Sequence, residues 1–150
     1  MNRRWLAIAL AVIGMGILAP GRADAACTIS STAVLFGNYD VFATSPRDST
    51  GTVSYQCDRG TNVRITLTRG SSPTYVPRTL LKGIDVLAYN IFLDPARSQV
   101  WGDETQGTVA YYAHVSANRT TDVTMHGRIP AAQDSASGPY SDTLTAIINF

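Results

Sequence analysis

The chain has 150 residues, 45% of them hydrophobic, and its 12 basic and 11 acidic side chains give a formal net charge of +1. This length fits one globular domain. The near-zero charge and the scatter of the arginines exclude binding of nucleic acid through a basic surface, because affinity for phosphate backbones depends on clustered Lys and Arg.

The first 25 residues have the organisation of a secretory signal peptide. Arg3 and Arg4 precede an apolar run over 5–19, and Ala23-Asp24-Ala25 has the small-x-small pattern of a cleavage site. A membrane anchor is the alternative, but the run spans about 15 residues where about 20 are needed to cross a bilayer. We therefore predict that residues 1–25 are removed, that 26–150 form one domain, and that the exported protein keeps no stable membrane insertion.

The chain has two cysteines, Cys27 and Cys57, and both lie after the predicted cleavage site. Oxidising conditions outside the cytoplasm favour their pairing. A disulfide that closes a loop of about 30 residues would contribute roughly 3 to 4 kcal/mol in the chain-entropy model. A catalytic or metal-binding thiol pair would be expected closer in sequence and beside His or more Cys. We predict a structural disulfide between the two.

Short alternating segments follow one another along the rest of the chain. Apolar residues at every second position are typical of half-buried β-strands. The candidate strands cover 29–36, 52–57, 62–67, 87–93, 109–115, 123–129 and 144–150, and turns rich in Gly, Pro, Asn and Ser separate them. No segment after the leader has a sustained helical period. Seven antiparallel strands at this spacing predict an all-β, immunoglobulin-like antiparallel β-sandwich of two sheets.

The C-terminal strand ends the sequence without a polar tail. Its alternate residues Leu144, Ala146, Ile148 and Phe150 share one face, because strand side chains repeat every two residues. This face is predicted to belong to the core, and the strand is predicted to take part in the function.

A series of motifs along the mature chain resembles a known family. These motifs are Phe36-Gly37-Asn38-Tyr39-Asp40, Ser49-Thr50-Gly51-Thr52-Val53, the run 87–94 with Ala96-Arg97, Trp101-Gly102-Asp103, Gly127-Arg128-Ile129-Pro130, and Tyr140-Ser141-Asp142-Thr143-Leu144. In order and spacing they are similar to the spore coat protein U domain, which includes the subunits of archaic chaperone-usher pili. The similarity is one of scaffold residues, and scaffold alone does not fix function.

The resemblance implies an incomplete sandwich that lacks its final strand. The C-terminal strand would then border a hydrophobic groove, which a periplasmic chaperone and later a neighbouring pilus subunit fill with a donated β-strand, with an outer-membrane usher as a further partner. The expected lining is Leu144, Ala146, Ile148 and Phe150, with Cys27 and Cys57 fixing the opposite edge of the sandwich. Four or five buried apolar side chains would contribute on the order of 6 to 15 kcal/mol, which is comparable to the whole stability of a small domain.

One departure from the polymerising members concerns the segment before the first cysteine. Those members carry there the strand that they donate, whereas Ala26 alone separates the predicted cleavage site from Cys27. We therefore expect a terminal or minor subunit of a surface fimbria or coat, which accepts a strand but gives none. The alternative is an autonomous, non-polymerising surface protein with an adhesive or carbohydrate-binding role, for which Tyr75, Trp101, Tyr112 and Tyr140 could present aromatic faces. Taken singly, each of these residues is better explained as a ring that closes the sandwich core with its polar end in water.

Residues with catalytic or metal-binding potential are few. His114 and His126 fall on the polar faces of neighbouring candidate strands, and a hairpin centred near Thr120 would place them opposite each other. Two imidazoles alone rarely hold a metal, since zinc sites use three or four protein ligands. No nucleophile elbow, carboxylate pair or phosphate loop is present in the sequence. We predict no enzymatic activity, no metal and no cofactor.

Overall fold

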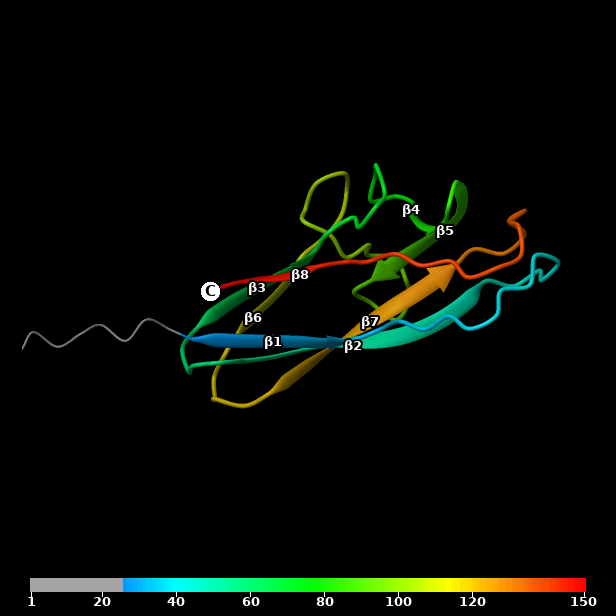
Figure 1. Ribbon diagram of the computed structural model, residues 1–150. Helices are drawn as coiled ribbons and strands as arrows, with labels where there is room; N and C mark the ends of the chain where they lie inside the picture. Colours follow the sequence, from blue (N-terminus) through cyan, green and yellow to red (C-terminus); the bar gives the residue numbers. More distant parts are fainter. Residues whose placement is uncertain (1–25) are drawn as a thin grey trace, which may run out of the picture.

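The computed structural model describes residues 26–150, which form eight β-strands and no helix (Figure 1). The strands are β1 (Cys27–Thr32), β2 (Arg47–Cys57), β3 (Asn62–Leu67), β4 (Arg78–Lys82), β5 (Asp85–Phe92), β6 (Tyr111–His114), β7 (Thr121–Ile129) and β8 (Ala146–Asn149). Within this span no helix is long and apolar enough to cross a membrane. The predicted signal peptide, residues 1–25, lies outside the described residues.

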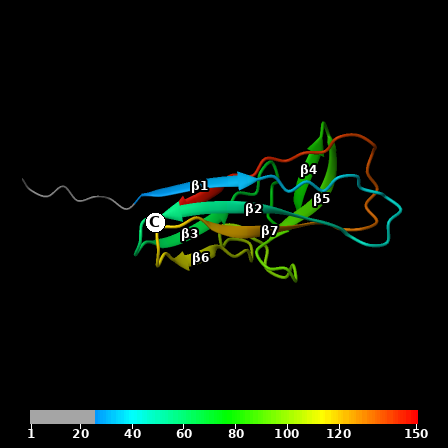
Figure 2. The same ribbon diagram turned by 90° about the horizontal axis from the view of Figure 1, so that it is seen from below.

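The strands form two antiparallel sheets, as predicted for a sandwich. The larger sheet has the order β1-β2-β7-β5-β4 and the smaller one the order β6-β3-β8. Figures 1 and 2 show β8 lying along β1 on one side of the molecule. Beyond these two strands, the connections 33–46 and 130–145 run side by side away from the smaller sheet.

Alternation of apolar and polar residues positions the core between the sheets. In the larger sheet Val53, Tyr55 and Cys57 of β2 face inward with Val123, Met125 and Ile129 of β7. Val63, Ile65 and Leu67 of β3 meet them from the smaller sheet. Burying each such side chain contributes about 1.5 to 3 kcal/mol, so the core accounts for the pairing of the two layers.

The predicted disulfide is present between Cys27 and Cys57. The two cysteines are register partners at one end of the β1–β2 pair, which continues to Thr32 and Thr52. The bond therefore fixes β1 along the edge of the larger sheet.

The predicted juxtaposition of the two histidines is wrong. β6 pairs with β3, so His114 lies opposite Asn62, whereas His126 in β7 lies between Thr50 and Phe92 of the larger sheet. The chain changes sheets between the two strands, and no hairpin forms around Thr120. Alternation indicates which residues share a face but not which sheet a strand joins.

A strand that the sequence pattern did not indicate, β4, closes one edge of the larger sheet. Its Arg78 is fully buried and donates hydrogen bonds to the carbonyl oxygens of Thr68 and Trp101 and to Asn90 Oδ1. The guanidinium carbon also lies 5.0 Å from the centre of the Tyr75 ring. Burial lowers the pKa of Arg78 from its ordinary value, and these acceptors compensate the desolvated charge.

Candidate functional site

Two strands at the edges of different sheets face each other across an opening. Among the described residues, β1 pairs with β2 alone and β8 pairs with β3 alone. The other backbone edge of each strand has no strand partner in residues 26–150. An unpaired edge presents a row of N–H and C=O groups that can bind a further strand.

A hollow of about 390 Å³ opens at these two edges. Its floor consists of inward-facing apolar side chains from both sheets. They are Val53, Leu67, Leu80, Tyr89, Ile91 and Met125. One wall is formed by the segment 31–36, at the end of β1, and the other by residues 142–146, at the start of β8. We call this hollow the groove.

Of the four side chains expected to line the groove, two lie among its lining residues and two do not. Leu144 and Ala146 are half-buried and line it directly. Ile148 is half-buried against the core, and its register partner Ile65 in β3 is fully buried. Phe150 follows the end of β8, and the residue is 58% exposed. The lining of a strand-binding site by these residues is part of the proposal made below.

Two glycines on the larger sheet make room for the wall after β1. Val34 and Phe36 point onto the sheet over Gly51 and Gly127; a Cβ on Gly127 would lie 2.7 Å from Val34 Cγ1 and 2.8 Å from Phe36 Cζ. The wall is also held by side chains of β2, since Ser49 Oγ donates to the Leu35 carbonyl at 2.6 Å. The sequence contained a signal for this cradle, because a glycine inside a strand indicates close approach of another segment.

A second hollow, of about 1210 Å³, continues the groove past the start of β8. It lies between the segments 33–42 and 135–142, over Leu80, Leu87 and Ile129 of the larger sheet. We call it the distal hollow. Sequence reasoning did not predict the distal hollow, since its two walls are connections rather than strands.

Asp142 stands where the two hollows meet. Its carboxylate accepts hydrogen bonds from the Ser71 and Thr143 amides at 2.9 and 2.8 Å, and from the Tyr89 hydroxyl at 2.7 Å. Burial, reinforced by this carboxylate, raises the pKa of Tyr89 far above its ordinary value, so that the phenol stays a donor. The contacts fix the wall at Asp142 onto the loop between β3 and β4.

Comparison with known proteins identifies the family. A family model described as the Spore Coat Protein U domain matches residues 19–147. The chain belongs to this family. A curated relative, "Protein U" of Myxococcus xanthus, is 30% identical over 83% of this chain and 78% of its own length.

A solved structure has the same fold as this Spore Coat Protein U domain. It is a chain in the crystal structure of the CsuC-CsuE chaperone-tip adhesion subunit pre-assembly complex from archaic chaperone-usher Csu pili of Acinetobacter baumannii. The TM-score is 0.60 and the sequence identity 21%, over 84% of this chain. This chain spans 40% of the length of that chain, and the likeness shows the sandwich fold.

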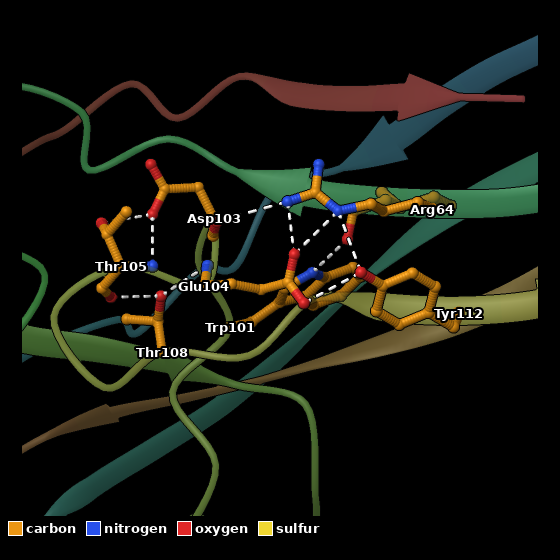
Figure 3. A network of polar contacts seen from close by, with 8 residues as sticks. Arg64, Trp101, Asp103, Glu104, Thr105, Thr108 and Tyr112 are labelled. Atoms are coloured by element: carbon orange, nitrogen blue, oxygen red, sulfur yellow. Dashed lines mark hydrogen bonds and ion pairs between the residues drawn. The ribbon is translucent and has the colours of Figure 1, made fainter.

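The outer face of the smaller sheet in this Spore Coat Protein U domain carries a polar patch (Figure 3). Arg64 of β3 donates to Glu104 Oε2 through both Nε and Nη2, at 2.9 and 2.5 Å, and Tyr112 of β6 donates to Glu104 Oε1 at 2.9 Å. The hydrogen bond from Arg64 holds the pKa of Glu104 below its ordinary value. The loop that presents Glu104 is built around Thr108, whose hydroxyl accepts from the Glu104 amide.

The four aromatic residues considered as binding faces separate into two groups. Trp101 is fully buried and donates from Nε1 to the Ile65 carbonyl at 2.9 Å, and Tyr75 is buried on Arg78. Neither ring can present the aromatic face that the adhesive alternative requires, and both are interior residues, as Tyr and Trp commonly are in a sandwich core. Tyr140 is half-buried, and Tyr112 is 60% exposed.

A second charged cluster lies on the outer face of the larger sheet. Asp48 of β2 accepts two hydrogen bonds from Arg128 of β7, at 2.7 and 2.8 Å, and Arg97 Nε lies 3.4 Å from it. The hydrogen bonds from Arg128 hold the pKa of Asp48 below its ordinary value. Among the residues described, no group of three His, Cys, Asp or Glu is placed to hold a metal ion.

Proposed function

We propose that this Spore Coat Protein U domain protein is a structural subunit of a chaperone-usher surface fimbria or coat, and that it accepts a β-strand from another polypeptide in the groove. The observation that carries the proposal is that β1 and β8, which belong to different sheets, face each other across an apolar hollow with their backbone edges unpaired. A strand between them would pair with both edges and insert alternate side chains into the hollow.

The size of the groove supports a large energetic effect of the occupant. Cavity volume in a protein core costs about 24 cal/mol per Å³, which for 390 Å³ gives an upper limit of about 9 kcal/mol, since the groove is open to water. This is of the order of the total stability of a small domain. The uncaptured subunit is therefore expected to be weakly folded and prone to associate.

The partners in this proposal are a periplasmic chaperone, an outer-membrane usher and neighbouring subunits. Family membership supports them, as does the shared fold with a chain from a chaperone–subunit complex of a pilus. The protein would pass through the periplasm and finish at the cell surface. No enzymatic activity is part of this role.

The place of the protein in a fibre depends on its mature N-terminus. Cleavage after Ala25 leaves Ala26 before Cys27, so the mature chain would accept a strand without donating one, as a terminal or minor subunit does. Mass spectrometry of protein purified from its host tests this. A mature start within residues 5–19 would supply a donor segment and contradict the terminal position.

The test of the groove uses the mature chain with and without a supplied strand. An Asn-Gly turn and about six residues with alternate Val or Ile are appended after Phe150, so that the new strand can run antiparallel to β8. We expect the plain chain to bind a hydrophobic dye and to melt broadly, and the extended chain to melt cooperatively as a monomer. A matched control has Ser at the apolar positions of the new strand. A plain chain that is compact, monomeric and cooperative, and unchanged by the strand, would refute the proposal.

The polar patch supports a second candidate, an autonomous adhesive or carbohydrate-binding surface protein. Tyr112 is exposed, and Arg64 and Glu104 hold its hydroxyl in place. Replacement of Tyr112 by Ala would then abolish adhesion while leaving secretion unchanged. Under the subunit proposal the same replacement leaves surface assembly intact.

A further inference from the structure

We infer that Asp58 is the binding site for the α-ammonium group of the mature chain, which cleavage after Ala25 creates on Ala26. The inference concerns the start of β1 rather than the groove. It rests on the cleavage site that the proposed terminal position also requires, and it does not depend on the binding of a donated strand.

The backbone nitrogen of Ala26 lies at the Asp58 carboxylate. It donates to Asp58 Oδ2 at 3.0 Å, and the Asp58 amide donates back to the Ala26 carbonyl at 3.1 Å. The two contacts continue the pairing of β1 with β2 one residue beyond Cys27 and Cys57, which the disulfide joins. The nitrogen that cleavage converts into a charged amine is therefore within hydrogen-bond distance of a carboxylate.

The turn between β2 and β3 makes the Asp58 side chain the acceptor for Ala26. In a regular antiparallel ladder the Ala26 nitrogen would donate to the Asp58 carbonyl. That carbonyl instead accepts from the amide and the hydroxyl of Thr61, at 3.4 and 2.7 Å. Gly60, whose φ is 89°, donates to the Val115 carbonyl at 2.7 Å and attaches the turn to the smaller sheet. The side chain of Asp58 is thus held in place opposite the start of β1.

An ammonium group would give the Asp58 carboxylate a cationic partner. None of the ion pairs formed among residues 26–150 involves Asp58. The other charged or titratable groups on the elements around it are Arg59 in the same turn, His114 at the end of β6, Arg119 in the loop after β6, and the carboxylate of Phe150, which lies at the same end of the molecule as the start of β1 (Figure 1). A hydrogen bond with charge on both groups is shorter and stronger than one from a neutral amide.

The site distinguishes the processed chain from its precursor. In the precursor the Ala26 nitrogen is a neutral amide, so it can donate the same hydrogen bond without forming an ion pair. A chain cut earlier would place its ammonium group at another position. Because β1 is one of the two open edges at the groove, removal of the signal peptide would strengthen the attachment of this edge at its first residue, beside the disulfide.

The test titrates the α-amino group of protein that its host has exported and cleaved. The mature chain then has two primary amines, the α-amino group and the side chain of Lys82, the only lysine. Reductive methylation with isotope-labelled formaldehyde therefore gives two sets of NMR signals, which are followed against pH in the folded and in the urea-unfolded protein. The plain mature chain is used if it is a cooperative monomer, and the strand-extended chain otherwise.

Three variants isolate the pair. Asp58→Asn removes the charge and keeps the shape of the side chain. Asp122→Asn is the matched control, because Asp122 lies opposite Ser54, which is level with Ser30, four residues or about 13 Å along β1 from Ala26. Insertion of Gly-Ser after Ala25 keeps Asp58 and its turn unchanged but moves the ammonium group two residues away.

We expect the pKa of the α-amino group to be higher in the folded than in the unfolded protein, because the ion pair favours the charged form. Asp58→Asn should lower this pKa by about 0.2 to 0.7, the effect of a solvent-exposed ion pair. Asp122→Asn should leave it unchanged, and the insertion variant should have the same α-amino pKa folded and unfolded.

An equal pKa in the folded and unfolded unmodified protein would overturn the inference. Equal effects of Asp58→Asn and Asp122→Asn, an insertion variant that keeps the raised pKa, or a mass spectrum that shows a mature start other than Ala26 would overturn it as well. These outcomes leave the acceptance of a strand in the groove untouched, and failure of the supplied strand to stabilise the protein leaves the pair at Asp58 untouched.

Discussion

Adjacent isoleucines in β8 offer a matched test of the groove, because Ile148 faces the core side and Ile147 the outer side. Ile148 lies opposite the fully buried Ile65, whereas Ile147 lies opposite Thr66 and is 44% exposed. We predict that Ile148→Asp prevents accumulation of the subunit in the periplasm by blocking strand capture. Ile147→Asp should accumulate normally.

The free-energy cost of Ile148→Asp for strand capture follows from the surface that a bound strand would cover. Aspartate at 148 loses the burial of an aliphatic side chain, about 1.5 to 3 kcal/mol, and docking of a strand would also desolvate the new carboxylate, which costs more than the about 1 to 3 kcal/mol of a neutral polar group. The total is therefore more than about 2.5 kcal/mol, which weakens capture by roughly two orders of magnitude or more. Surface substitutions such as Ile147→Asp usually change stability by about 0.5 kcal/mol.

Two assays measure this difference. Quantitative immunoblots of periplasmic extracts from the native host give the accumulation of each variant. Denaturant unfolding of the strand-extended protein gives the free-energy cost of each substitution directly. Equal accumulation of the two variants, or equal unfolding costs, would refute the assignment of the Ile148 face to strand binding.

Three further predictions concern the walls of the groove and the surface ion pairs. Replacing Cys27 and Cys57 by Ser should lower the free energy of unfolding of the strand-extended protein by about 3 to 4 kcal/mol; a loss below about 1 kcal/mol would contradict the role of the disulfide in fixing β1. Gly127→Ala should cost about 1 to 3 kcal/mol by overpacking, and Val34→Ala in the same chain should recover part of that cost; additive losses in a double-mutant cycle would contradict the proposed contact. The pKa of Asp48 is lowered in the folded state, so its contribution to stability is present above the ordinary carboxyl pKa of 3.8 and is lost as pH falls through the lower folded value. Unfolding free energies measured from pH 7 to 2 should therefore fall less steeply in Asp48→Asn, and an unchanged slope would contradict this.

The fold could be predicted because it depends on local patterns. Alternation in segments such as 53–57 and 63–67 reports burial on one face, and that is what the sandwich core requires. The pairing of Cys27 with Cys57 followed from the export signal and the number of cysteines. Strand β4 was not predicted, because its sequence Arg78-Thr79-Leu80-Leu81-Lys82 does not alternate between apolar and polar residues. In addition, a fully buried arginine is rare unless it has hydrogen-bond partners inside the protein, and those of Arg78 (Thr68, Asn90 and Trp101) lie in other segments.

The candidate site was predictable on one side only. The alternation of Leu144, Ala146 and Ile148 marks the wall at β8. A glycine inside a strand indicates that some segment approaches closely, but a single sequence does not state that this segment is the one with Val34 and Phe36. That contact depends on register between strands, which alternation does not encode. For the same reason alternation did not show that His114 and His126 belong to different sheets.

The two open edges lie lengthwise beside each other and run in opposite chain directions, which bears on how an assembled fibre would carry load. β1 begins and β8 ends at the same end of the molecule (Figure 1). A strand between them would be antiparallel to one and parallel to the other, with hydrogen bonds that cross to its neighbours rather than run along the strand axis. Tension applied along a strand seated between β1 and β8 would therefore shear the whole row of bonds together, instead of unzipping them one at a time from an end. Mechanical strength would then rise with every residue of the inserted strand that is paired.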